Sequence, residues 1–67
     1  MNFNKNLSIA RKAAGFTQRE LADTIGVYQK DITSWENGDS SPDVVALANI
    51  CRALHVSSDA LLETGKG

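Results

Sequence analysis

The sequence predicts an all-α domain that is compact and consists of five short helices. Apolar residues recur three and four positions apart over most of the chain, which is the spacing of one helix face. Glycine, serine, threonine and proline separate these segments, and no segment shows the strict alternation of a half-buried strand. Because the chain has 67 residues, we expect a single domain over residues 1–67.

The composition is that of a globular protein, with 42% apolar and 22% charged residues. Cys51 is the only cysteine, which excludes an intramolecular disulfide and a thiol-based zinc site. We see no signal-peptide pattern and no apolar run near the ~18 residues of a membrane span, so we expect a cytoplasmic protein without a membrane partner. A net charge of −1 argues by itself against a nucleic-acid partner, which usually binds a basic surface.

The first two helices are predicted from a stripe and a cap. The apolar stripe of the first helix consists of Phe3, Leu7, Ala10 and Ala14. Gly15 follows this stripe and ends the helix. In the second, Thr17 to Glu20 fits a capping box, and Phe16 before the cap is placed to pack onto Leu21. The apolar face of this second helix consists of Leu21, Ala22 and Ile25.

The third helix is expected from about Tyr28 to Asn37, after a turn that contains Gly26. Only Ile32 and Trp35 mark a buried face, and the rest of the segment is polar. We interpret Trp35 as a core anchor rather than a platform on which bases stack.

The fourth helix is expected to begin at Ser41 as its N-cap, with Pro42 at the first helical position. His55 closes this helix, and its apolar stripe consists of Val44, Leu47, Ile50, Cys51 and Leu54. A fifth, short helix is expected over residues 59–62, followed by a disordered end at residues 64–67.

The second and third predicted helices form a helix-turn-helix over about residues 17–37. A second helix that has few apolar residues leaves one side free to enter a DNA major groove, which is wide enough for an α-helix. Short polar side chains near the beginning of such a helix reach base edges.

The chain resembles the Cro and phage-repressor helix-turn-helix regulators, the lambda repressor-like or XRE type, which are a standard example of this motif. The resembling segments cover the chain from about Phe3 to Leu62 and are A-R-K-A-A-G-F-T-Q-R-E-L-A (10–22), I-G-V-Y-Q-K-D-I (25–32), W-E-N-G (35–38), Pro42 and A-L-H-V-S-S-D-A-L-L (53–62). The resemblance implies a five-helix domain that binds double-stranded DNA as a sequence-specific transcriptional regulator, commonly as a homodimer on paired half-sites.

The resemblance also implies residue roles. The positions that contact bases or the adjoining backbone in the family correspond here to Gln29, Lys30, Thr33 and Ser34, and Tyr28 stands where the family often has a serine or threonine cap. From their chemistry, glutamine pairs bidentately with adenine and lysine donates to guanine. For Thr33 and Ser34 an inert surface role remains the alternative.

The candidates for phosphate contact are Gln18, Arg19, Lys12, Arg11, Asn37 and Gly38. Asn37 and Gly38 are expected to offer backbone N–H groups. Arg11 has two interpretations, a phosphate contact or an ion pair, and Glu36 is the partner that we expect for the ion pair.

The chain departs from the family pattern after W-E-N-G, where the family often has lysine or arginine. Here the turn carries Asp39 and Asp43, and Asp31 adds a further acid inside the third helix. Acids near phosphates weaken the electrostatic part of DNA binding. The alternative function is therefore a protein-binding module, such as an antitoxin or adaptor, with weak DNA affinity.

An enzyme is not expected. The chain has one histidine, one cysteine and no glycine-rich phosphate loop, so no nucleophile and base share a recognisable spacing. We also find no cofactor motif and no metal site. His55 stands where the family usually has glycine, and we expect it at a left-handed helix end.

Overall fold

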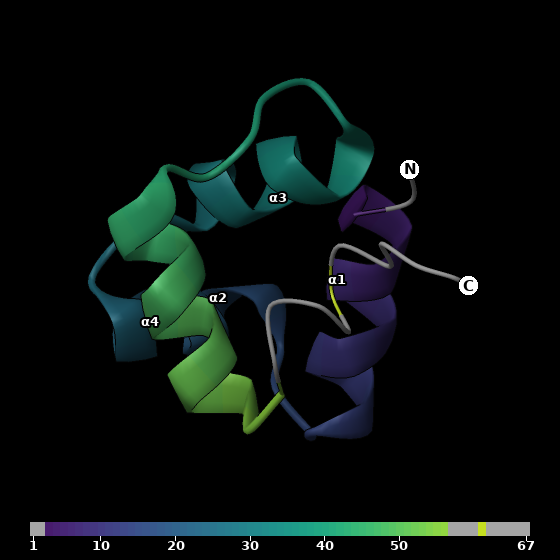
Figure 1. Cartoon of the computed structure of the whole chain (residues 1–67), viewed down its shortest axis with the longest axis vertical. Helices are drawn as coiled ribbons and strands as arrows, with labels where there is room; N and C mark the ends of the chain where they lie inside the picture. Colours follow the sequence, from purple (N-terminus) through teal and green to yellow (C-terminus); the bar gives the residue numbers. More distant parts are fainter. Residues whose placement is uncertain (1–2, 57–60, 62–67) are drawn as a thin grey trace.

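The computed structural model describes residues 3–56 and residue 61 (Figure 1). These residues form four helices and no strand: α1 (Phe3–Ala13), α2 (Gln18–Ile25), α3 (Gln29–Asn37) and α4 (Val44–Leu54). The all-α prediction is confirmed for this part of the chain. The predicted fifth helix lies outside the described residues except for Leu61, which is helical and buried.

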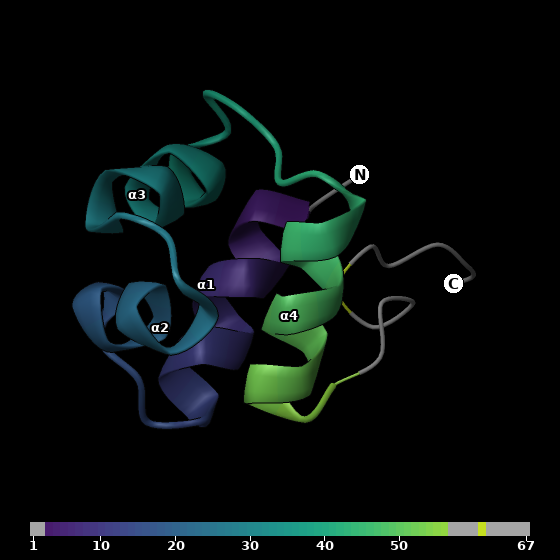
Figure 2. The ribbon, with the colours of Figure 1, turned by 90° about the vertical axis from the view of Figure 1, so that its left-hand side faces the viewer.

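The helices enclose one apolar core. α2 packs against both α3 and α4, and α1 packs against α3. Figures 1 and 2 show α3 lying across one end of the molecule next to α2, with α1 and α4 on opposite sides in Figure 1. The core consists of Leu7, Leu21, Ala22, Ile32, Trp35, Ile50, Leu54 and Leu61.

The capping box of α2 forms as predicted. The Thr17 hydroxyl accepts from the Glu20 N–H at 3.0 Å, and the Glu20 carboxylate accepts from the Thr17 N–H at 2.9 Å. Phe16, just before the cap, is half-buried and packs against the core. These contacts fix where α2 begins, and they set the direction from which the chain enters it.

The predicted beginning of α4 is wrong. Asp43, and not Ser41, is the N-cap, since its carboxylate accepts from the Ala46 N–H at 2.7 Å. Serine and aspartate cap equally well, so residue type did not distinguish the two positions. The shift places Val44 at the first helical position, where it is 83% exposed and not part of the buried stripe. Ala14 likewise lies after the end of α1 and is exposed.

The end of α4 is as predicted. His55 adopts the left-handed conformation, with φ 58° and ψ 42°, and its N–H donates to the Cys51 carbonyl. It is the one non-glycine residue with positive φ among the residues that the structure describes. Among the same residues, no helix has both the length and the apolar character that a membrane crossing requires.

Candidate nucleic-acid interface

The residue that caps the beginning of α3 is aromatic. Tyr28 precedes the helix with an extended backbone, and the Asp31 carboxylate accepts from its N–H at 3.1 Å. The Tyr28 side chain makes no cap hydrogen bond. The residue is 73% exposed to solvent. The Nζ of Lys30 lies 5.7 Å from the centre of the Tyr28 ring. Tyr28 and Lys30 therefore form one exposed corner at the beginning of α3.

The two faces of α3 differ completely. Ile32 and Trp35 point into the core, which confirms their interpretation as anchors. The opposite face borders a shallow hollow lined by Gln29, Lys30, Thr33, Ser34, Asn37 and Asp39. The structure thus brings together four of the five side chains predicted to face bases, with Tyr28 at the adjacent corner.

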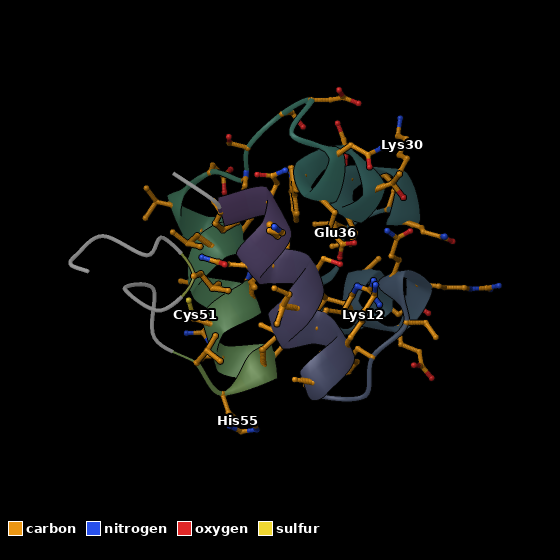
Figure 3. The ribbon with its side chains drawn as sticks, turned by 90° about the vertical axis from the view of Figure 1, so that its right-hand side faces the viewer. Lys12, Lys30, Glu36, Cys51 and His55 are labelled. Atoms are coloured by element: carbon orange, nitrogen blue, oxygen red, sulfur yellow. The ribbon has the colours of Figure 1, made fainter. Side chains whose placement is uncertain are left out.

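Two cations predicted to contact phosphates are exposed. Lys12 lies in the last turn of α1, and Arg19 in the first turn of α2. Neither forms an ion pair with any residue that the structure describes. Figure 3 shows Lys12 and Lys30 on the part of the surface formed by α1, α2 and α3, whereas Cys51 lies on α4 and His55 directly follows the end of α4.

Arg11 is buried rather than exposed. Its Nε and Nη2 donate to the two carboxylate oxygens of Glu36, at 2.6 and 3.3 Å, and its Nη1 donates to the Phe16 carbonyl at 2.7 Å. The expected partner, Glu36, is therefore confirmed. Because the guanidinium is engaged inside the protein, Arg11 acts as the partner of Glu36 and not as a phosphate contact.

Two further hydrogen bonds connect the ion pair to the surface of the helix-turn-helix. The Nε2 of Gln18 donates to Glu36 at 3.0 Å, and the Thr33 hydroxyl donates to the Oε1 of Gln18 at 2.9 Å. Four side chains from α1, α2 and α3 thus form one continuous chain of hydrogen bonds: Arg11, Glu36, Gln18 and Thr33.

Glu36 is the central acceptor of this chain. Figure 3 shows Glu36 where α3 faces α1 and α2. Burial alone would raise the pKa of the Glu36 carboxyl, but hydrogen bonds from Arg11 and Gln18 and the charges of Arg11 and Lys12 hold that pKa below its ordinary value. The carboxylate is therefore ionised at neutral pH, and it only accepts hydrogen bonds.

Gly38 ends α3 in the left-handed conformation, with φ 84°. Its N–H donates to the carbonyls of Ser34 and Trp35, and the next N–H, of Asp39, also donates to Ser34. The Gly38 N–H already closes the helix, so it is not free to donate to a phosphate as predicted. For Asn37 the predicted donor is also the backbone N–H, and this stays a prediction. Its side chain is exposed and lines the hollow, so the side-chain amide is a second candidate donor.

Two details of the site go beyond what the sequence indicates. The resemblance implies that Gln18 braces the third helix, and the acid Asp39 is expected near phosphates, but neither expectation names the partner or the exact position. The link between Gln18 and Thr33 joins residues 15 positions apart on different helices, so no periodicity reveals it. Asp39 lines the hollow because α3 ends at Gly38 and the chain turns back beside the helix.

Cys51 and His55 lie outside this surface. Cys51 is half-buried and packs against the core, and burial raises the pKa of its thiol. Within residues 3–56 and Leu61, no group of three or more histidine, cysteine or acidic side chains is placed to hold a metal ion.

Known proteins share this arrangement of helices. A helix-turn-helix family matches residues 7–61, which include α2, α3 and the turn between them. The chain belongs to this helix-turn-helix family. The resemblance to Cro and phage-repressor regulators is confirmed.

Proteins that resemble this chain in sequence include bacterial and phage regulators. An uncharacterized HTH-type transcriptional regulator of Bacillus subtilis, YqaE, is 39% identical over 61 residues, which cover 91% of this chain and 53% of that protein. The cryptic phage CTXphi transcriptional repressor RstR of Vibrio cholerae is 34% identical over 91% of this chain and 54% of its own length. The chain therefore spans about half the length of these relatives.

A solved structure of the P22 c2 repressor in complex with a synthetic operator has the same fold. It superposes with a TM-score of 0.89 at 26% sequence identity, over 97% of this chain and 98% of that chain. The similarity extends over the whole helix-turn-helix and the helices that support it.

Proposed function

We propose that this chain binds double-stranded DNA sequence-specifically and regulates transcription, most simply as a small repressor. The observation that carries the proposal is the asymmetry of α3, with Ile32 and Trp35 buried on one side and polar side chains gathered around a hollow on the other. An α-helix with such a polar face fits a major groove. The named functions of YqaE, RstR and the P22 c2 repressor support the proposal.

In this proposal the beginning of α3 reads bases. Gln29 and Lys30 are exposed, and their amide and ammonium groups suit adenine and guanine respectively. Ser34, one turn later, accepts from the Ser40 hydroxyl at 2.9 Å and so keeps its own hydrogen to donate. The exposed ring of Tyr28 offers an apolar contact for a thymine methyl.

Phosphate contacts would come from around this surface. Lys12 and Arg19 supply positive charge, and Gln18 and Asn37 supply amide donors. We further propose a homodimer in the cytoplasm, associated with the nucleoid, that reads two half-sites about 34 Å apart, one helical turn of DNA.

A test is selection of bound duplexes from a random DNA pool, with the wild type and the Gln29→Ala/Lys30→Ala variant side by side. The matched control is Arg52→Ala, which removes one positive charge from the exposed surface of α4. We expect wild type and control to enrich the same motif, and the α3 variant to lose it. Loss of the motif in the control, or its retention in the α3 variant, would contradict a reading role for α3.

The second candidate is a protein-binding module, such as an antitoxin or adaptor, with weak DNA affinity. It is favoured by the acids at this surface, since Asp39 lines the hollow and Asp31 lies in the first turn of α3. The two candidates differ in salt dependence. DNA binding through several phosphates weakens steeply as salt rises, because counterions are released on binding. If wild type enriches no motif even at low salt, the protein-binding function is favoured.

A further inference from the structure

We infer that Thr33 is a positioning residue for DNA binding, whose hydroxyl holds the Gln18 carboxamide in one orientation instead of reading a base. The inference rests on the proposed function and assigns a role within the same surface. It follows from the directions of two hydrogen bonds, one between Gln18 and Glu36 and one between Thr33 and Gln18.

Glu36 sets the direction of these hydrogen bonds, because it can only accept. Its carboxylate is paired with the Arg11 guanidinium through two hydrogen bonds and carries no hydrogen to donate. The neighbouring Gln18 must therefore turn its NH₂ group toward Glu36, where Nε2 lies 3.0 Å from Oε1. The carbonyl oxygen of Gln18 then faces the other way, toward Thr33.

At Thr33 the hydroxyl is the donor, and its single hydrogen is already engaged. Its Oγ1 lies 2.9 Å from the Gln18 Oε1 and 3.2 Å from the Gln29 backbone carbonyl oxygen, and both of these atoms are acceptors. A hydroxyl has a single hydrogen, so none is left for an acceptor on a base edge. Ser34 differs, because its hydroxyl accepts from Ser40.

These hydrogen bonds also determine which Gln18 hydrogen is available to DNA in the proposed complex. One Nε2 hydrogen is held by Glu36, so the second hydrogen has a fixed direction and is the one left to donate to a phosphate oxygen. Since Gln18 opens α2 and Thr33 lies in α3, the same bond couples the two helices of the helix-turn-helix. A phosphate contact positions the protein without reading sequence. Losing the Thr33 bond should therefore weaken binding to every duplex alike.

The experiment is a double-mutant cycle on DNA affinity. Thr33→Val keeps the shape but removes the donor, Thr33→Ser keeps the donor, and Gln18→Ala removes the group that Thr33 holds. Affinity is measured on the duplex that wild type selects and on a duplex of unrelated sequence. We expect Thr33→Val to lower both affinities about fivefold, which is the effect of one net hydrogen bond. Thr33→Ser should bind like wild type, and Thr33→Val should add nothing in the Gln18→Ala background.

Two results would overturn the inference. One is a changed base preference of Thr33→Val in selection from the random pool, which would make Thr33 a reading residue. The other is full additivity of Thr33→Val and Gln18→Ala, which would show that Thr33 does not act through Gln18.

A measurement without DNA separates this inference from the proposed function. The side-chain NH₂ signals of Gln18 are followed by ¹⁵N NMR in wild type, Thr33→Ser and Thr33→Val. We expect only Thr33→Val to shift these signals and speed their hydrogen exchange. If the signals are unchanged, Thr33 does not hold Gln18, whatever the protein binds. If they change but wild type binds no duplex, the proposed function fails and a role of Thr33 in DNA binding fails with it.

Discussion

The Nε of Arg11 lies 2.6 Å from the Oε2 of Glu36, across the contact between α1 and α3. Both side chains are nearly removed from solvent, with 9% and 6% of their surfaces exposed. Each charge therefore depends on the other, since water cannot replace the missing partner. The ion pair and its hydrogen bond to Gln18 hold α3 at a fixed orientation to α1 and α2.

Breaking this pair should destabilise the domain strongly. We expect Arg11→Met or Glu36→Leu alone to lower the free energy of unfolding by about 3 kcal/mol, because each leaves one buried charge unpaired. This is a large part of the stability of a domain of this size. Urea denaturation followed by circular dichroism measures the change.

The double variant Arg11→Met/Glu36→Leu is the control, because it leaves no charge unpaired. We expect it to be more stable than either single variant, as apolar replacements of buried ion pairs often are. A double variant as unstable as the sum of the two single variants would show that the charges act independently.

Low pH should lower the free energy of unfolding, because the Glu36 carboxylate becomes protonated. Because the folded state lowers the pKa of Glu36, its contribution to stability is fully present above the ordinary glutamate pKa, which is about 4.3. That contribution is lost as the pH falls through the lower pKa of the folded state. Carboxyl ¹³C NMR should show a Glu36 titration midpoint below that of glutamate in an unstructured peptide. A midpoint above the peptide value would mean that burial outweighs the Arg11 and Gln18 contacts.

The end of α4 carries a strained residue. His55 has φ 58°, a conformation that costs a non-glycine residue about 1–2 kcal/mol. His55→Gly should therefore raise the free energy of unfolding by about 0.5–1 kcal/mol, after the greater chain entropy of unfolded glycine is subtracted. Thermal unfolding should show a Tm higher by a few degrees. Ala48→Gly, inside the same helix, is the matched control and should lower Tm.

The acid beside α3 should limit DNA affinity. Asp39 lines the hollow together with the candidate reading residues, so its charge would lie near phosphates in the proposed complex. We expect Asp39→Asn to strengthen binding about two- to fivefold at low salt, on specific and unrelated duplexes alike, and less as salt screens the charge. Asp23→Asn, which removes an exposed acid of α2 outside the hollow, is the charge-matched control. Equal gains from both variants would argue against a special position of Asp39.

Local signals predicted most of the framework, because they act between neighbouring residues. The capping box at Thr17 and Glu20 needs only a spacing of three residues, and it forms. The three-residue spacing of Ile32 and Trp35 identified the buried side of α3. The beginning of α4 was predicted wrongly, since Ser41 and Asp43 are equivalent caps by residue type.

The sequence by itself determined that the described part is all-helical, that α2 and α3 form a helix-turn-helix, and that α3 exposes a polar side. These properties follow from periodicity and from caps that close within one turn. Tertiary structure alone decided that Arg11 is engaged inside the protein, that Val44 is exposed, and that Thr33 and Gln18 are partners. Side chains distant in sequence meet only after the helices have packed. Which donor is used up and which remains free then depends on burial and on the direction of each hydrogen bond.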